Sequence, residues 1–318
     1  MEIIMPTKLK LVVSSLLLAL TAAGSAHAGV VDLGIGGANI FTKGNFSAPY
    51  GDVEGAVVVG GNLTGAAGYS INLNNKDAYD GYALAVHGTL TYSYASILNG
   101  KIYSGGAQTL NGVGTGGSTL TDVAPVNFAA VSSSVTAKAT ALSKLTSTVT
   151  QTTAYSNMTL HGTNKGVEVF NITGADLAGV SSFHFDGLQS GATLIVNISG
   201  TGEQGFRASG VELNVFAPYN VLFNFYETDK LRIQSVGVYG SLLAPNAAVQ
   251  GGNGQINGNV VVASWDSGVQ INSNHYFVAT EVPGFASAVP EPETYAMLLS
   301  GLGLMGFIAR RRKQAAAR

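Results

Sequence analysis

The residues that could act as nucleophiles, general bases or metal ligands are few in this chain and lie far apart. None of its 318 residues is cysteine, and beyond residue 28 the histidines are His87, His161, His184 and His275. Acid–base and nucleophilic catalysis both need a reactive group held beside a second one. None of the spacings H-E-x-x-H, G-x-S-x-G or paired Cys and His occurs. We therefore predict that the chain is not an enzyme and that it needs no cofactor.

One stretch is rich in the side-chain oxygen atoms that Ca²⁺ prefers, namely residues 72–80. Ca²⁺ takes six to eight oxygen ligands, whereas this stretch has few carboxylates, a competing Lys76 and no EF-hand pattern. We interpret it as a solvated loop and predict no metal site. The glycine-rich stretches 34–37 and 112–117 lack the P-loop lysine and the spacing of a dinucleotide fingerprint, so they are predicted to be turns.

The start of the chain has the three parts of a secretory signal peptide. A segment with two lysines precedes the apolar run 11–20, and Ala26 and Ala28 then form a small-residue cleavage site. The apolar run is short for a helix that spans a bilayer. We predict a signal peptide over residues 1–28, export by the Sec machinery and a mature chain that begins at residue 29.

The other end of the chain combines prolines, an apolar run and a basic tail. The apolar residues 294–309 are somewhat short against the ~20 that span a bilayer, and the tail 310–318 should stay in the cytoplasm. The residues alone leave open whether this segment is a lasting anchor or is cut off. The polar residues that define the segment are Pro290, Glu291, Pro292, Arg310, Arg311 and Arg312.

This last part, over residues 285–318, resembles a PEP-CTERM sorting signal. The resemblance implies that the Pro-Glu-Pro tripeptide at 290–292 is recognised by an exosortase-type membrane enzyme. It also implies a transmembrane helix over 294–309, and a host among the Gram-negative bacteria that make exopolysaccharide. The protein is then held in the inner membrane for a time, before it reaches the cell surface or the extracellular matrix.

The charge between residues 29 and 290 is low and mildly acidic. Nine Lys and Arg stand against 15 Asp and Glu, a net charge of about −6. Nucleic acids and anionic membranes attract clustered basic residues, so neither is an expected partner. Charged residues are 11% of the chain and glycine is 42 of 318, which favours a β-structure with many tight turns.

Short apolar runs bounded by Gly or Asn predict strands through most of the chain. They recur from residue 32 to about residue 120 and again after residue 190. Between them, apolar residues follow a helical period, which predicts one amphipathic helix at about 125–149 with Asp122 as its cap. The strands expected in the second half are 193–198, 211–215, 221–226, 236–247 and 256–263. The helical stripe is Phe128, Val131, Val135, Ala139, Leu142, Leu145 and Val149.

Two distant runs share one pattern, apolar-x-Gly-x-Val-Val-Val. They are residues 53–59 and 256–262. Recurrent short strands of this kind are typical of a β-solenoid, whose turns stack to bury a continuous core. The fold class we predict is mainly β, a β-solenoid or β-helix-like domain over 29–284 with one flanking helix. Because the period is irregular, a β-sandwich stays open as the alternative.

Several short motifs of this domain, such as Gly51-Asp52-Val53-Glu54-Gly55 and Leu243-Ala244-Pro245-Asn246-Ala247, resemble the choice-of-anchor A family of bacterial surface domains. The likeness rests on motifs that occur in the family's order. It implies a surface location and an adhesive role, and it carries no catalytic residue. The motifs are Gly51-Asp52-Val53-Glu54-Gly55, Gly60-Gly61-Asn62, Ile195-Val196-Asn197-Ile198-Ser199-Gly200, Val221-Leu222-Phe223-Asn224-Phe225, Leu243-Ala244-Pro245-Asn246-Ala247 and Ile256-Asn257-Gly258.

Taken together, these features predict an exported surface or matrix protein that acts as an adhesin or structural component of a biofilm. Its expected partners are the exosortase, the Sec machinery and exopolysaccharide or another matrix component. The alternative is a secreted β-helix protein that binds or cleaves polysaccharide. An ice-binding solenoid is disfavoured, since Thr-x-Thr occurs at 89–91 and 119–121 but not in the strands expected after residue 190. Some tyrosines could stack on sugars, and the alternative for most of them is packing within the rungs. They are Tyr50, Tyr69, Tyr79, Tyr82, Tyr92, Tyr94 and Tyr103.

Overall fold

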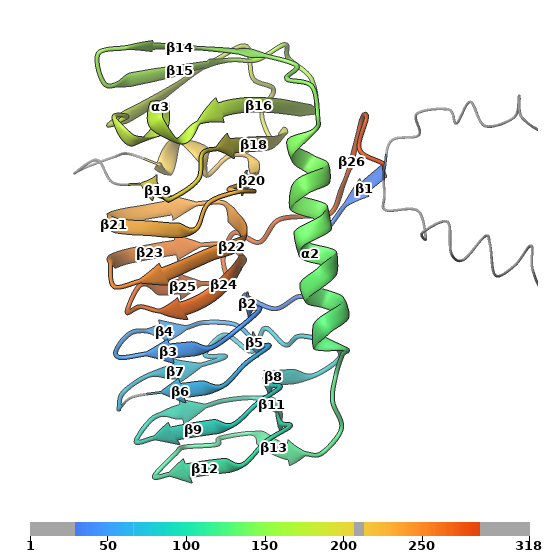
Figure 1. Ribbon diagram of the computed structural model, residues 1–318, viewed down its shortest axis with the longest axis vertical. Coiled ribbons are helices and arrows are strands. Elements are labelled where there is room, and N and C mark those ends of the chain that lie inside the picture. Colours follow the sequence, from blue (N-terminus) through green and yellow to red (C-terminus); the bar gives the residue numbers. More distant parts are fainter. Residues whose placement is uncertain (1–28, 66, 207–212, 287–318) are drawn as a thin grey trace, which may run out of the picture.

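The computed structural model describes residues 29–286 apart from 66 and 207–212. The chain winds into a three-sided coil of short parallel strands, with one long helix lying along its side (Figure 1). Each turn of the coil, called a rung here, adds a strand to as many as three parallel ladders. The predicted solenoid architecture is therefore confirmed. The sandwich alternative is wrong, because sandwiches are built from antiparallel strands.

Face 1 of the coil is the ladder beside the helix. From the top of Figure 1 to the bottom, its strands are β16 (Val167–Thr173), β18 (Thr193–Ser199), β20 (Asn220–Asn224), β22 (Ser241–Gln250), β24 (Val260–Asp266), β2 (Ile40–Thr42), β5 (Val57–Val59), β8 (Tyr82–Val86), β11 (Gly100–Ser104) and β13 (Ser118–Thr121).

Faces 2 and 3 complete the rungs. Face 2 holds the second halves of β22 and β24 together with β19 (Glu203–Phe206), β21 (Lys230–Tyr239), β3 (Phe46–Ala48), β6 (Leu63–Gly65), β9 (Leu90–Ser93) and β12 (Gln108–Asn111). Face 3 holds the second half of β21 with β23 (Asn253–Asn257), β25 (Gln270–Asn272), β4 (Asp52–Val53), β7 (Ser70–Ile71) and β10 (Ser96–Ile97).

The order of the rungs in space differs from their order in the chain. The chain enters the coil in the middle at β2, descends to β13, crosses upward through the helix and then descends from β16 to β25 (Figure 1). The two halves join where β24 and β2 pair, with Ile40 opposite Val260. On its other side β2 pairs with β5, with Ile40 opposite Val57. The two Val-Val-Val runs thus occupy one ladder, one on each side of β2.

Alternation along the strands of face 1 creates two separate apolar cores. In β2, Ile40 belongs to the core inside the coil, whereas Phe41 belongs to the core between the coil and the helix. Successive residues of a strand point to opposite sides, so a run in which every residue is apolar can fill both cores. This is why the Val-Val-Val runs carry no polar residue.

The long helix is α2 (Phe128–Ser143), which packs its stripe on face 1. Five of the predicted stripe residues are buried within the helix, namely Phe128, Val131, Val135, Ala139 and Leu142. The predicted cap at Asp122 is wrong. The cap is Asn127, whose Oδ1 accepts a 3.0 Å hydrogen bond from the Ala130 backbone N–H. The helix also ends at Ser143, before Leu145 and Val149, both of which are still buried.

A small mixed sheet and aromatic side chains cover the upper end of the coil. The sheet consists of β14 (Thr150–Ala154), β15 (Asn157–His161) and β17 (Ser182–Asp186), and α3 (Gly174–Ala178) lies beside it (Figure 1). The prediction of a strand at 211–215 is wrong for residues 213–215, the part of this range that the structure describes. Asn214–Phe216 form the short 3-10 helix η2, which turns Phe216 into contact with Phe183 and Phe223.

The two ends of the described chain are tied together beside the helix. The strand β1 (Gly29–Val31) pairs antiparallel with β26 (Thr280–Val282). No helix within the described residues is long and apolar enough to cross a membrane. The predicted signal helix and transmembrane helix lie outside the described residues.

Candidate functional site

The residues assigned to sorting and cleavage fall outside the part of the chain that the structure describes. These are Ala26, Ala28, Pro290, Glu291, Pro292, Arg310, Arg311 and Arg312. Their roles stay predictions from the sequence. Within the described residues, the question becomes which surface of the coil could contact another molecule.

Face 2 is the open side of the coil, and small polar side chains line its lower part. Ser47, Thr64, Thr91 and Thr109 stand opposite one another on β3, β6, β9 and β12. They point outward, because Phe46, Leu63 and Leu90 beside them are buried in the core. In-register strands repeat about every 4.8 Å, so the four hydroxyl groups form a regular outward file.

Amide side chains at the adjoining corner hold the same strands in register. The Oδ1 atom of Asn45 accepts a 2.9 Å hydrogen bond from the Asn62 backbone N–H, and Oδ1 of Asn62 accepts one of 2.9 Å from Thr89 N–H. Each side chain therefore bonds to the next rung, where the chain turns between two faces. This arrangement fixes the spacing of the hydroxyl file without the help of charged residues.

Two exposed tyrosines stand at the other edge of face 2, at the corner with face 3. Tyr50 is 57% exposed and Tyr94 is 72% exposed. A methyl group added to Gly268 would lie only 2.0–2.4 Å from three ring atoms of Tyr50, so that ring covers the glycine face-on. The ring of Tyr94 lies more loosely beside Gly112, with one edge 2.9–3.1 Å from such a methyl group. Each ring rests on backbone and leaves a surface open to solvent.

The other tyrosines of the proposed sugar-stacking set do not share this exposure. Tyr69, Tyr82 and Tyr92 are buried, and Tyr79 and Tyr103 are half-buried. Burial raises the pKa of Tyr79 to about 12 and that of Tyr92 further. Most tyrosines of the set therefore pack in the rungs, and Tyr50 and Tyr94 are the members that remain largely exposed to a ligand.

Further along face 2, toward the capped end, the outward file becomes charged. Its members there are Asp266, Gln250 and Arg232. A polar hollow of about 270 Å³ opens beside them, lined by Lys230 and Arg232 among others. One guanidinium nitrogen of Arg232 lies 3.6 Å from Oε1 of Glu203, so opposite charges already meet in this hollow.

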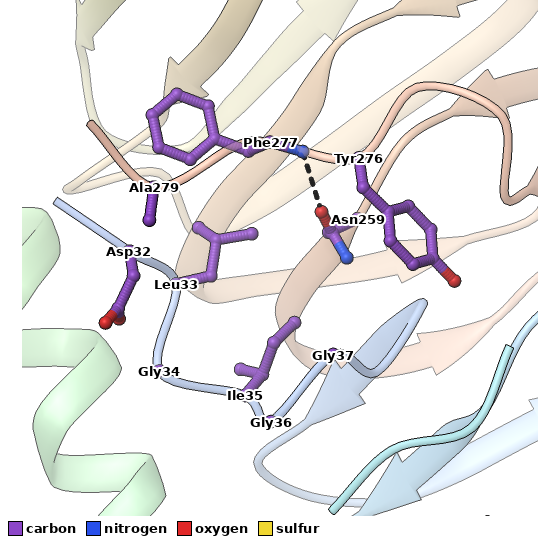
Figure 2. Close-up of a pocket in the computed structure, with 10 residues that line it drawn as sticks. All are labelled: Asp32, Leu33, Gly34, Ile35, Gly36, Gly37, Asn259, Tyr276, Phe277 and Ala279. Carbon is purple, nitrogen blue, oxygen red and sulfur yellow. Dashed lines mark hydrogen bonds between the residues drawn. The ribbon is translucent and has the colours of Figure 1, made fainter.

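A second hollow of about 290 Å³ lies where the two ends of the domain cross (Figure 2). The segment from Asp32 to Gly37 forms one wall and Tyr276 to Ala279 the other. Asn259 stands between them, and its Oδ1 accepts a 2.9 Å hydrogen bond from the Phe277 backbone N–H (Figure 2). Its amide group donates to the Ala38 carbonyl at 2.8 Å. Because the Asn259 side chain already forms these hydrogen bonds, we interpret this hollow as the place where the segment Tyr276–Ala279 is attached to the coil.

Glycan cleavage would require available carboxylates, but two carboxylates of the coil form hydrogen bonds that hold the fold together. Glu168 is buried, and it accepts hydrogen bonds from Thr148, from Thr163 and from the Lys165 backbone N–H. Oε2 of Glu54 accepts a 2.8 Å bond from the Ser273 backbone N–H. Neither residue lines any of the hollows described above.

Asp52 is the carboxylate with the most unusual surroundings. Burial raises the pKa of Asp52, a hydrogen bond with Gln270 opposes the rise, and the nearby charge of Glu54 adds to it. Its Oδ1 atom is buried, and no hydrogen-bond partner for it occurs within the described ranges. Two carboxyl groups in unlike surroundings are the arrangement that glycosidases use. Among the described residues, Asp52 and Glu54 are the carboxyl pair on which we would test the cleavage alternative first.

The histidines and the oxygen-rich loop make internal contacts. His161 lies 3.5 Å from Asp186 and 2.9 Å from the Thr152 hydroxyl, at the capped end. The ring of His275 bonds to the Tyr219 carbonyl. In the loop, Asn72 donates a 2.8 Å bond to Asp77 Oδ1. The described residues contain no group of three His, Cys, Asp or Glu side chains that could hold a metal ion.

Comparison with known families identifies the domain. The family model described as "Putative Ice-binding-like adhesive domain" matches residues 34–273, which is most of the chain and nearly all of the coil. The chain belongs to this family. The PEP-CTERM protein-sorting motif matches residues 288–313, which agrees with the tail predicted from the tripeptide at 290–292. No curated protein and no solved structure matches the chain.

These two matches define what the adhesive-domain protein is at a coarse level. The sorting motif marks an exported surface protein that an exosortase processes. The choice-of-anchor A likeness stays a prediction, because the matched family has a different name. The two Thr-x-Thr runs lie on different faces, 89–91 on face 2 and 119–121 on face 1, so they do not form one ladder.

Proposed function

We propose that this adhesive-domain protein is a non-enzymatic adhesin that binds extracellular polysaccharide along the edge of face 2. The observation that carries the proposal is the pair Tyr50 and Tyr94. Both rings lie on glycine backbone, remain largely exposed and stand at the same corner of the coil, two rungs apart. Two rungs correspond to about 10 Å along the axis.

The chemistry of a sugar chain suits this surface. A sugar ring has an apolar C–H face, which packs on the negative face of an aromatic ring. Its hydroxyl edges are donors and acceptors, and the hydroxyl file from Ser47 to Thr109 beside the tyrosines offers both functions as well. Because both tyrosines are held on a rigid coil, binding costs little side-chain order.

The low charge of the surface supports a neutral partner over a charged one. Apart from Asp266 and the charged hollow near the capped end, face 2 presents hydroxyl and amide groups. Sorting by an exosortase would place this face outside the cell, where matrix polysaccharide is at hand. A surface of this kind retains a polymer without changing it.

The test is co-sedimentation of the exported protein with the exopolysaccharide of its own host, compared with unrelated glucans. The amount of new reducing ends is measured in the same tubes. Saturable binding without new reducing ends is the expected result. Absence of binding would overturn the polysaccharide proposal. Release of reducing ends would show an enzyme, and Asp52→Asn would then be the first variant to examine.

A second candidate ligand is ice, because the family name includes ice binding and the hydroxyl file is regular. A measurement of thermal hysteresis distinguishes it from polysaccharide binding. A clear hysteresis that Thr91→Tyr abolishes would favour ice. Its absence, with polysaccharide binding present, leaves the first proposal in place.

A further inference from the structure

The lower end of the coil is open, in contrast to its upper end. The last rungs of the coil, at the bottom of Figure 1, contain β11 and β12, and β13 adds one more strand to face 1 below β11. β12 pairs only with β9, and β13 only with β11, among the strands that the structure describes. Each of these two strands therefore presents an edge of backbone N–H and C=O groups to the outside.

The interior of the coil reaches the surface at this end. Within face 1, the inward residues form a column from Val260 through Ile40, Val57 and Leu84 to Ile102, and Leu120 is its last member. Ile102 is buried, but Leu120 is 63% exposed because no rung follows it. Leu110 and Val113 pack against the core from the same rung and are only partly buried.

The open end lacks the features that normally prevent strand edges from pairing. Natural edge strands are protected by charged side chains, prolines or covering segments. Residues 102–121 contain no Asp, Glu, Lys, Arg, His or Pro. At the upper end the β14–β15 hairpin covers the core with polar residues such as Thr152 and Thr153.

We propose that two copies of the chain join end to end through this open rung. A two-fold axis would place β13 antiparallel to β13 of the second copy and stack Leu120 on its counterpart. A second copy fits this end because the surface is neutral over 20 residues, so two identical ends meet without repulsion. The contact would satisfy the free strand edges and continue both the ladder and the interior column.

The assembly would be a closed dimer. The two-fold contact is isologous and uses the open end of both copies, so this contact closes at two copies. The dimer would present two copies of face 2. Simultaneous contact with one polymer would then strengthen binding through effective concentration.

Cysteine scanning in the full chain tests the proposal in the exporting cell. The chain has no cysteine of its own, and exported compartments allow disulfides to form. Leu120→Cys, which meets its own counterpart at the two-fold axis, and the double variant Thr119→Cys/Thr121→Cys, in which each cysteine lies opposite the other one of the second copy, should give a disulfide-linked band of twice the monomer mass, since opposite residues of an antiparallel pair lie within disulfide reach. The control is Thr152→Cys, exposed on β14 at the capped end, which should stay monomeric. No dimer in either of these variants, an equal dimer with the control, or a band of another mass would each overturn the proposal.

Light scattering on the exported, processed protein gives a second test. Leu120→Lys should halve the measured mass, because it adds a charge to the contact and removes no buried group from the single copy. Val278→Lys changes an equally exposed apolar residue, 66% exposed, at another place and should leave the dimer intact. A monomeric wild type would overturn the dimer. The mass does not depend on polysaccharide, so this outcome is separate from that of the binding assay.

Discussion

The Nδ2 group of Asn224 donates a 2.8 Å hydrogen bond to Oδ1 of Asn197, and the same amide donates a 2.9 Å bond to the Ala139 carbonyl of α2. Asn197 repeats the arrangement one rung higher, with bonds of 2.9 Å to Oδ1 of Asn171 and to the Leu142 carbonyl. Below Asn224, apolar residues such as Leu243 and Phe41 face the helix instead. Apolar packing thus runs along the whole helix, and at its C-terminal half the asparagine side chains add hydrogen bonds to it.

Replacing the middle amide should loosen this attachment. Asn197→Ala removes three hydrogen bonds from a largely buried setting, those with the Leu142 carbonyl, with Asn171 and with Asn224. Each such bond contributes about 0.5–1.5 kcal/mol to stability. We expect the free energy of unfolding to fall by about 2 kcal/mol or more in urea denaturation. Asn246→Ala removes a bond to the Tyr226 carbonyl at an exposed site and should change stability by less than about 0.5 kcal/mol. Equal losses of unfolding free energy in the two variants would contradict a stabilising role of the hydrogen bonds among Asn171, Asn197 and Asn224.

The place of the large aromatic residues inside the coil depends on glycine. A Cβ atom at Gly65 would come within 1.7–1.9 Å of two ring atoms of buried Tyr92. Overpacking of a core typically costs about 1–3 kcal/mol, so Gly65→Ala should lower the melting temperature clearly. Gly166 has open space around its Cα and no positive φ, and Gly166→Ala should be neutral or slightly stabilising. A Gly65→Ala variant as stable as the wild type would show that Tyr92 repacks freely.

The raised pKa of Asp52 predicts a pH dependence with a definite sign. The folded state favours the neutral carboxyl, so the contribution of Asp52 to stability is present at low pH and is lost as pH rises through its folded pKa. Asp52→Asn keeps a neutral side chain at every pH. The melting temperature of Asp52→Asn minus that of the wild type should therefore increase as the pH rises from about 4 to about 7. A difference that is constant with pH, or that shrinks, would contradict this assignment.

The sorting tail should act through its tripeptide. Glu291→Ala removes the acidic residue of the Pro-Glu-Pro signal that the exosortase would recognise. The uncut chain should therefore accumulate in the membrane fraction. Glu281→Ala, on β26 and outside the motif, is the control that should be processed normally. The measurement is the apparent mass of the protein in membrane and surface fractions by immunoblot. Normal processing of Glu291→Ala would contradict recognition of the tripeptide.

Much of the architecture could be predicted because the solenoid repeats itself locally. The shared Val-Val-Val pattern indicated rungs, and the helical stripe gave α2 with its buried residues. The seam between β24 and β2 could not be predicted, since Val260 and Ile40 lie some 220 residues apart and no local pattern encodes that pairing. The cap was misplaced because Asp122 and Pro125 imitate a helix start that Asn127 provides.

The binding surface was less accessible to sequence reasoning, although one signal was present. Tyr92 lies two residues after Leu90 in β9, so both side chains point inward, whereas Thr91 points outward. This alternation ends at the corner between faces 2 and 3, where Tyr94 has a positive φ of 52° and its side chain leaves the core. Contacts between a ring and a glycine of another rung, as between Tyr50 and Gly268, appear only in three dimensions.

The central claim is that the tyrosine corner of face 2 holds polysaccharide, and the affinity of tyrosine variants tests it most directly. Dissociation constants for the host exopolysaccharide should be compared between the wild type, Tyr94→Ala and Tyr155→Ala. Tyr155 is fully exposed at the capped end, so it is a matched control far from the corner. We expect Tyr94→Ala to bind about tenfold more weakly, equivalent to about 1.4 kcal/mol, and Tyr155→Ala to bind like the wild type. Unchanged affinity in Tyr94→Ala, or equal losses in both variants, would contradict the claim.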